Sequence, residues 1–286
     1  MNQASLFEPE RVARAELCRA IEYLDLARAS RKLEEFQQIW PEAPLSWEPE
    51  LVRIGLPLSR RRLDFDSGYR VWKNLESQLA PLEVPSPRAA AIRRHFFSRL
   101  LAANRGLFEE LRTPAGRSLG DFYLLADQPK NARRRYEQEL RRLGERWELR
   151  LRLGDCNYRL GHSGAARSNY HWSFLLGLPE ESWKSIEDDE FLARLRQAEE
   201  ACWAFPETCA CGEIPSARFS SRRDFEEFKS TFAPGLTESD AARSFSFYWV
   251  VSENKVFCPD RELLEARRQM KALNSRLHAR NMQRIR

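Results

Sequence analysis

Apolar residues recur every three or four positions along most of this chain, and proline, glycine and polar clusters separate the stretches that show this spacing. The spacing places apolar side chains on one face of an α-helix, so it predicts a succession of amphipathic helices. The predicted helices cover residues 8–28, 30–40, 48–59, 64–79, 87–112, 114–126, 130–143, 147–160, 164–176 and 181–203.

Residues 113–177 contain an internal repeat with an offset of thirty-four residues. The shift places Leu119-Gly120-Asp121 on Leu153-Gly154-Asp155, Ala132 on Ala166, and Tyr136 on Tyr170. A repeat of this length is a pair of helices that cannot bury its apolar face alone and therefore stacks on copies of itself. The pattern predicts a short solenoid in which the hairpin at 48–79 is a degenerate copy.

The repeat fails beyond Pro179, because Asp188 falls thirty-four residues after Gly154 and cannot take the place of the glycine, and the chain after residue 203 forms a separate segment. Residues 204–221 are rich in Pro, Gly, Ser and Cys and are typical of a loop, and a short helix is expected at 222–232. The aromatic and β-branched residues at 245–251, followed by a polar turn and residues 256–258, predict two short strands. A final helix begins near Asp260.

These elements together predict a mainly α fold: a right-handed solenoid of helical hairpins with a small C-terminal α+β segment that contains a β-hairpin. The solenoid is expected over residues 1–203, with repeats at 113–146 and 147–180 and a capping helix at about 181–203. The C-terminal segment covers residues 204–286.

The repeated positions resemble those of the tetratricopeptide repeat (TPR) family over 113–177. The small residues would let facing helices approach closely, and Tyr136 and Tyr170 would fill the space between hairpins. In this family the first helices of successive hairpins line a concave groove that binds peptides. The resemblance therefore implies a partner-binding groove formed by Arg117, Asp121, Leu124, Leu151, Asp155, Tyr158 and Arg159. An alternative is that Asp121 and Asp155 only pair with neighbouring arginines.

Composition favours a folded protein, because apolar residues make up 42% of the chain and charged residues 31%. The sequence contains neither an apolar run long enough for a membrane span nor a secretory signal at its start, so we expect a cytoplasmic protein with reduced cysteines.

Positive charge is concentrated at the C-terminal end of the chain. The formal net charge is +5, yet residues 267–286 hold seven basic residues and no acid. This basic tail consists of Arg267, Arg268, Lys271, Arg276, Arg280, Arg284 and Arg286. It is either a nucleic-acid or acidic-partner contact or a frayed, solubilising helix end. The arginines of 133–152 alternate with glutamates and are expected to form a solvated face with weak ion pairs.

Candidate chemistry is sparse. The four histidines, His95, His162, His171 and His278, show no metal-ligand spacing, and no common catalytic motif is present. Cys202, Cys209, Cys211 and Cys258 are weak metal candidates, because their spacing does not match the paired pattern of zinc sites. No cofactor is expected.

The sequence therefore predicts a protein–protein interaction scaffold that holds a peptide or a partner domain in its groove. A nucleic-acid-associated helical-repeat protein that uses the basic tail is one alternative. An enzyme with an unrecognised site in 204–286 is the other, and catalysis is the less favoured class.

Overall fold

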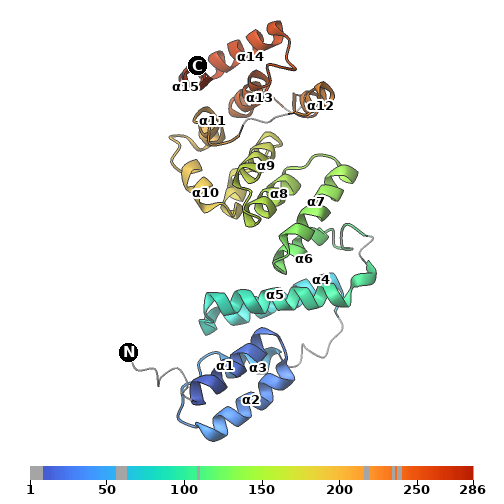
Figure 1. The fold of residues 1–286 in the computed structure, drawn as a ribbon, viewed down its shortest axis with the longest axis vertical. Helices are drawn as coiled ribbons and strands as arrows, with labels where there is room; N and C mark the ends of the chain where they lie inside the picture. The colour runs from blue at the N-terminus through green and yellow to red at the C-terminus, as the bar shows by residue number, and fades with distance from the viewer. Residues whose placement is uncertain are drawn as a thin grey trace. The chain divides into compact units, whose positions relative to one another are not determined.

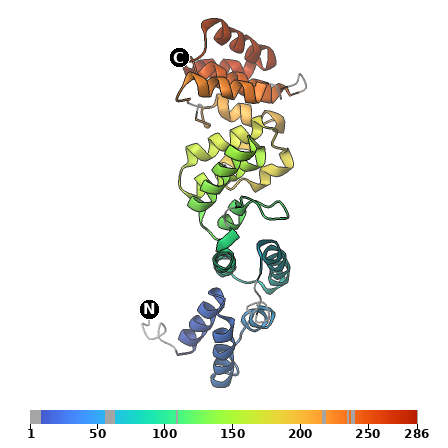
Figure 2. The same ribbon diagram turned by 90° about the vertical axis from the view of Figure 1, so that its right-hand side faces the viewer.

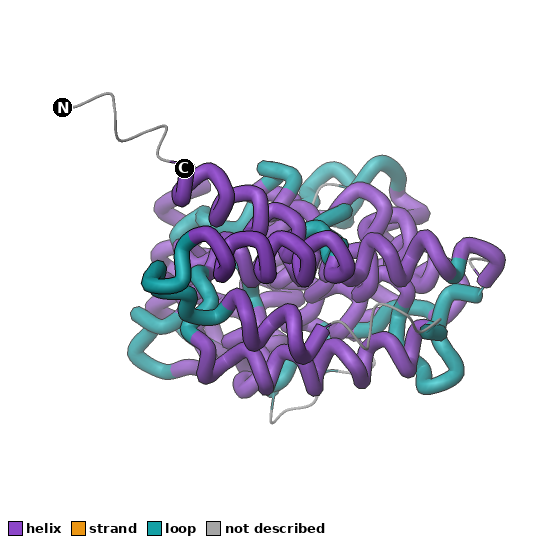
Figure 3. Tube along the Cα trace, turned by 90° about the horizontal axis from the view of Figure 1, so that it is seen from below, coloured by secondary structure: helices purple, strands orange, loops and turns teal. Residues whose placement is uncertain are grey.

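The computed structural model describes residues 9–55, 63–107, 110–215, 219–233, 236 and 240–285, and these residues are mainly α-helical (Figure 3). Within them the only β-structure is an isolated antiparallel bridge between Arg112 and Ser118. Contacts divide the chain into two compact units, residues 1–132 and 133–286, and each unit is described by itself. The predicted domain boundary near residue 203 lies inside the second unit.

The first unit consists mainly of helices. They are α1 (Pro9–Glu22), α2 (Leu26–Ile39), α3 (Glu48–Gly55), α4 (Phe65–Leu79), η3 (Ala80–Leu82), α5 (Ser86–Ala103), η4 (Arg105–Leu107) and α6 (Leu119–Leu125). The predicted end of the third helix, at residues 56–59, lies outside the described residues. Aromatic side chains dominate the core of this unit: the ring centroids of Phe65 and Phe122 are 4.9 Å apart, and those of Trp72 and Phe97 are 5.5 Å apart.

Three predicted helix boundaries in this unit are wrong. The break between the first two helices lies at residues 23–25, between α1 and α2, and not at residue 29. Helix α5 ends at Ala103 instead of continuing to 112, and the Asn104 side chain then donates hydrogen bonds to the carbonyls of Leu63 and Leu100, both at 2.9 Å. Thr113 does not open a helix, because its hydroxyl donates to Asp66 (2.7 Å) within a tight turn. Helix α6 begins only after Ser118, whose hydroxyl accepts from the Gly120 amide at 2.9 Å.

The second unit contains the rest of the chain. Its elements are α7 (Pro129–Leu143, from residue 133 onward), α8 (Trp147–Arg159), α9 (Ser163–Leu175), η5 (Glu180–Ser185), α10 (Asp189–Leu195), η6 (Ala201–Trp203), α11 (Ala204–Ala210), α12 (Arg222–Phe232), α13 (Ala241–Glu253), α14 (Asp260–Leu273) and α15 (Ser275–Ile285). Helices α8 and α9 lie side by side in both ribbon views (Figures 1 and 2). The helices predicted at 130–143, 147–160, 164–176 and 222–232 are confirmed.

The predicted strand pair is wrong, because residues 245–251 belong to helix α13. Phe245, Trp249 and Val250 are fully buried, and α13 packs against α9, α11 and α14. A short apolar run does not distinguish a strand from a helix that is buried on most sides, and here tertiary packing overrides the β-propensity of its residues. The predicted second strand, residues 256–258, is a turn in which the amides of Phe257 and Cys258 donate to the Asn254 carbonyl.

The expected capping helix at 181–203 is also wrong. This segment folds into η5, α10 and η6. Asp188 interrupts it by capping a new helix: its Oδ1 accepts from the Phe191 amide at 2.9 Å. The expected loop at 204–221 likewise begins with helix α11, which tolerates Pro206 because a proline in the first turn replaces an amide that has no helical partner.

Candidate functional site

The second unit contains an open groove with a cavity volume of about 740 Å³. Its walls come from α7, the turn that follows it, α8, α9 and α12. Leu140 of α7 and Leu153 of α8 supply apolar surface, and Glu227 and Thr231 of α12 supply polar surface. The groove is therefore a shallow, mainly polar surface held between packed helices, and we call it the α7–α12 groove.

Arg150 organises one wall of the α7–α12 groove. Its Nε donates to Glu145 Oε2 at 2.7 Å and its Nη1 donates to Asn169 Oδ1 at 3.3 Å. The guanidinium carbon lies 4.5 Å from the centroid of the Trp172 ring, a cation–π distance. These contacts join α8, α9 and the turn before α8, so this wall is preorganised.

Two asparagines beside Arg150 use their amide nitrogens locally. Asn157 Nδ2 donates to the Leu153 carbonyl and Asn169 Nδ2 donates to the Ala165 carbonyl, both at 2.9 Å. These bonds to the backbone four residues earlier hold the side chains in place. The opposite wall contains a hydrogen-bond donor that is not used. Arg133 Nε is buried and lies 3.4 Å from Glu137 Oε1, but it has no hydrogen-bond acceptor within the described part of the chain.

The groove residues implied by the TPR resemblance lie elsewhere. In the second unit, Leu151 and Asp155 are buried, Tyr158 is 37% exposed, and Arg159 pairs with Glu187 at 2.5 Å. None of these four belongs to the lining of the α7–α12 groove.

The implied groove residues of the first unit do not form an open surface either. Leu124 is buried and Asp121 is half-buried. The Arg117 guanidinium lies 3.9 Å from the centroid of the Tyr69 ring and 4.0 Å from Asp66. Arg117 is therefore held by its own unit, in the manner of a structural side chain.

Helical geometry explains why the residues implied by the resemblance and the residues that line the α7–α12 groove lie on different sides of α8. The groove takes Arg150, Leu153 and Asn157, which are spaced three and four residues apart and so share one face of the helix. Leu151 and Asp155 share a different face, which is buried. The sequence shows both stripes, but only the packing of α7 and α12 decides which stripe borders a hollow.

The buried face of α8 carries an unusual carboxylate, Asp155. Its Oδ1 accepts from the Tyr170 hydroxyl at 3.1 Å and from the Glu187 amide at 3.3 Å, and its Oδ2 accepts from Arg152 Nη1 at 3.1 Å. Burial, together with the nearby Glu187 carboxylate, raises the pKa of Asp155 to about 6. Asp155 therefore fastens α8 to α9 and to the segment before α10, and its charge depends on pH.

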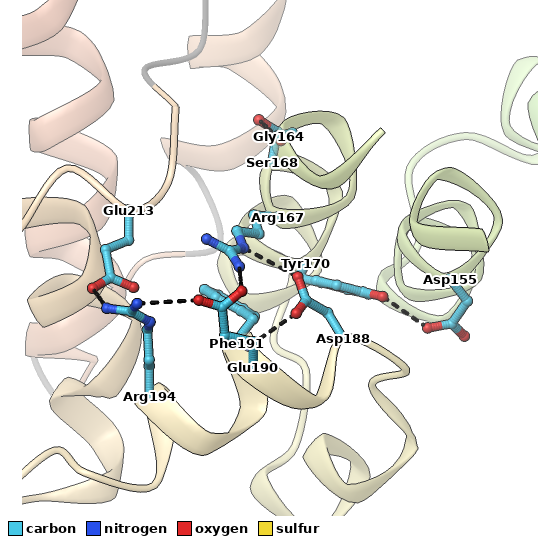
Figure 4. A network of polar contacts seen from close by, with 10 residues as sticks. All are labelled: Asp155, Gly164, Arg167, Ser168, Tyr170, Asp188, Glu190, Phe191, Arg194 and Glu213. Atoms are coloured by element: carbon cyan, nitrogen blue, oxygen red, sulfur yellow. Dashed lines mark hydrogen bonds and ion pairs between the residues drawn. The ribbon is translucent and has the colours of Figure 1, made fainter. Parts of the chain in front are cut away.

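A chain of ion pairs continues from this point across α9 and α10 (Figure 4). Arg167 of α9 binds Asp188 at 3.0 Å and Glu190 at 3.2 Å. Arg194 of α10 then links Glu190 to Glu213, so the network reaches the end of the α11 segment. Asp188, which ends the sequence repeat, is thus a buried structural acid.

The cysteines do not gather. Cys202 and Cys211 are exposed, whereas Cys209 and Cys258 are buried. Within the described ranges, no three His, Cys, Asp or Glu side chains are placed to hold a metal ion.

Cys209 instead lies beside a buried histidine: its Sγ is 3.5 Å from His171 Nε2. Burial lowers the pKa of His171 to about 3 and raises the pKa of Cys209 well above its usual value. Both groups are therefore neutral near pH 7, and the pair does not provide an ionised thiolate nucleophile.

The basic tail folds back onto the second unit. Arg276 binds Glu199 at 3.1 Å and Glu207 at 3.3 Å, and Arg284 binds Glu253 at 3.0 Å. Arg268 lies 3.8 Å from Glu265, and Arg267, Lys271 and Arg280 show no ion pair with the described residues. Arg286 lies outside the described residues. The run without acids in the sequence thus has acidic neighbours in space.

Comparisons with known proteins add no functional assignment. The sequence matches no family model, and no curated protein or solved structure is significantly similar to it. None of the helices in the described ranges combines the length and the apolar character that crossing a bilayer requires.

Proposed function

We propose that the second unit is a protein-interaction module that binds an extended segment of another protein in the α7–α12 groove. The observation that carries this proposal is the groove itself: about 740 Å³ of open, mainly polar hollow between helices that are fixed by packing and hydrogen bonds. Binding residues on rigid helices lose little conformational entropy when a partner docks.

The lining of the groove suits a peptide better than a small apolar ligand. Typical pockets for small molecules are enclosed and predominantly apolar. Here arginine, glutamate and asparagine side chains surround two leucines, Leu140 and Leu153. A peptide supplies both charged side chains and backbone amides to such a surface, together with an apolar side chain for the half-buried Leu140, since Leu153 is only 5% exposed.

The proposed architecture around the groove is a short TPR-like solenoid. Its support is the hairpin of α8 and α9, where Gly154 allows the Tyr170 ring to approach so closely that a Cβ atom on Gly154 would lie 2.2 Å from Tyr170 Cε1. This is the packing role that the repeat assigns to the glycine and the tyrosine. The copy at 113–146 and the right-handed stacking are part of the same proposal.

Filling the groove tests the proposed function. Thr231 is an exposed groove residue on α12, and Thr231→Trp would place an indole in the hollow. Peptides of about twelve residues, which extend over about 40 Å, would be selected from an unbiased library on the wild-type chain. We expect Thr231→Trp to weaken the selected peptides by at least about tenfold, because the indole occupies their site.

The matched control is Ser230→Trp on the same helix, because Ser230 is exposed but does not line the groove. We expect its binding to stay within about twofold of the wild type. Selection of no peptide, or equal weakening by both tryptophans, would show that the groove is not the binding site.

A further inference from the structure

The arginines around the α7–α12 groove fall into two groups that the sequence does not separate. One group is neutralised: Arg133 lies near Glu137, Arg150 binds Glu145, and Arg152 binds Asp155. The side chains of the other group form no ion pair, hydrogen bond or ring contact with the described residues, and all of them are exposed: Arg134, Arg141, Arg142 and Arg146. Arg142 lies about 100° around α7 from Arg141, away from the α7 residues that line the groove. We call the other three, Arg134, Arg141 and Arg146, the arginine strip.

The arginine strip borders the groove. Arg141 lines the groove directly, and Arg134 lies seven residues earlier on the same face of α7. Arg146 follows the groove residue Glu145 at the start of α8. A segment that lies in the groove therefore meets Arg141 in the lining, with Arg134 on the same face of α7 and Arg146 next to the lining in the chain.

Nearby acids offset this charge only in part, because Glu148, two residues after Arg146, is the one exposed acid beside the strip among the described residues. Glu137 and Glu145 already face Arg133 and Arg150, and Glu139 is fully buried. The interleaved glutamates of the sequence thus neutralise only the inner arginines. The expectation of a face with evenly paired charges holds for one side of this region and fails for the strip.

Helix stability does not account for the strip. Arg141 lies in the last turn of α7, where a cation gains a few tenths of a kcal/mol from the helix dipole. Arg146, however, occupies the N-cap position of α8 and makes no capping hydrogen bond with its side chain. A positive charge is unfavourable at a helix N-terminus, so this arginine weakens its own helix.

We propose that the segment bound in the groove is acidic and that its Asp or Glu side chains pair with the arginine strip. This inference rests on the proposed function and specifies the class of partner. A guanidinium binds a carboxylate through two parallel hydrogen bonds, which gives both energy and orientation. The three unpaired guanidinium groups of the strip match a segment that carries several carboxylates.

The groove favours an acidic peptide over a nucleic acid. Glu137, Glu145 and Glu227 all line it, and a phosphate backbone carries a negative charge at every nucleotide. A peptide can place its acidic residues over the strip and neutral or basic residues beside Glu227, which has no ion pair within the described residues. The mixture of charges therefore selects a segment whose own charge is uneven.

Peptide selection also tests this inference. Peptides selected on the wild-type chain should be enriched in Asp and Glu. Arg134→Glu/Arg141→Glu should weaken them by at least about tenfold and, in a new selection, should favour Lys and Arg instead. Binding of the original peptides should also weaken as the ionic strength rises from about 0.05 M to about 0.3 M, because exposed charge pairs are screened.

The control variant carries the same change of net charge at another place. Lys271→Glu/Arg280→Glu alters two exposed tail residues that have no ion pair with the described residues, and peptide binding should stay within about twofold of the wild type. This comparison separates local pairing from a general effect of net charge, and it also tests the basic tail as the binding element.

The outcomes separate the inference from the proposed function. If Thr231→Trp weakens the binding of the selected peptides, but these peptides are not enriched in Asp and Glu, the inference is wrong and the proposed function stands. Selection of no peptide would overturn both. Tighter binding of a single-stranded RNA than of any selected peptide, lost in Arg134→Glu/Arg141→Glu, would replace the acidic peptide by a nucleic acid.

Discussion

Gly154 shows at the scale of one residue how the α8–α9 hairpin is held together. The Tyr170 ring is fully buried, its hydroxyl donates to Asp155, and its face lies 5.9 Å from the Phe191 ring centroid. A methyl group on Gly154 would lie 2.2 Å from Tyr170 Cε1, and a ring fixed at both ends has nowhere to move. The glycine is therefore required for close approach.

We expect Gly154→Ala to destabilise the second unit by about 2 kcal/mol. Overpacking of a rigid core costs about 1–3 kcal/mol and outweighs the gain of up to about 1 kcal/mol that alanine brings to a helix. Urea unfolding monitored by circular dichroism measures the difference.

Gly164→Ala is the matched control, because the nearest atom to its new Cβ is Pro215 Cγ at 3.4 Å, an ordinary contact. That variant should be as stable as the wild type or more stable by up to about 1 kcal/mol. Equal stabilities of the two alanine variants would contradict the close-packing account.

The sequence predicts such packing residues well but predicts side-chain environments poorly. Recurrence in register identified Gly154, Ala166 and Tyr170 as packing positions, and all three are buried. Recurrence also drew attention to Asp155, but the sequence does not show that Glu187 and Arg152 surround it. The partners of Asp155 depend on how the chain returns after α9, where the repeat has already ended.

At the scale of elements, helices with an amphipathic stripe could be predicted and fully buried ones could not. Helix α12 follows from its apolar spacing and from Ser221, whose hydroxyl accepts from the Asp224 amide at 3.1 Å. Helix α13 offers no polar face to define its period, so its sequence also suits a strand. The groove escaped prediction for a related reason: it depends on α12 packing on α9, where Phe228 and Phe232 contact Trp172, and these residues are distant in the sequence.

Helix α15 is an integral part of the second unit, although its basic sequence allows a frayed end. Leu277 and Asn281 are buried, and the Trp249 indole nitrogen donates to Asn281 Oδ1 at 3.2 Å. We expect Leu277→Ala to lower the free energy of unfolding by about 2–4 kcal/mol, since it leaves a cavity beneath the helix. Thermal or urea unfolding measures this loss.

The exposed Arg280 on the same helix provides the comparison. Arg280→Ala should change stability by less than about 0.5 kcal/mol, because the side chain has no ion pair with the described residues. If Leu277→Ala also changed the free energy of unfolding by less than about 0.5 kcal/mol, α15 would be a frayed end in solution and would not pack on the second unit.

At the scale of the whole molecule, each unit has its own buried core, and among the titratable groups that the second unit buries, Asp155 and His171 have opposite effects on stability. The pKa of Asp155 is raised to about 6 and that of His171 is lowered to about 3, in both cases mainly by burial. The two residues lie on α8 and α9, so they report on the same packed hairpin.

Between about pH 4 and pH 6, folding increases proton binding by Asp155 and decreases proton binding by His171. The folded chain keeps the Asp155 proton that the unfolded chain has released, so this residue makes stability fall as pH rises. The unfolded chain holds a His171 proton that the folded chain excludes, so the histidine makes stability rise as pH rises. Each slope approaches about 1.4 kcal/mol per pH unit, and in the wild type they largely cancel.

Removing one group at a time should expose the slope of the other. For Asp155→Asn, we expect stability relative to the wild type to increase by up to about 3 kcal/mol from pH 4 to pH 7, because the variant has no buried carboxylate to ionise. For His171→Gln, the relative change should have the opposite sign below about pH 6.5. Urea unfolding of the three chains at half-unit pH intervals measures both. If the stabilities of the three chains changed with pH in parallel, neither side chain would be buried in solution. If the two variants differ from the wild type with slopes of opposite sign, water is excluded from both Asp155 and His171 in the α8–α9 hairpin.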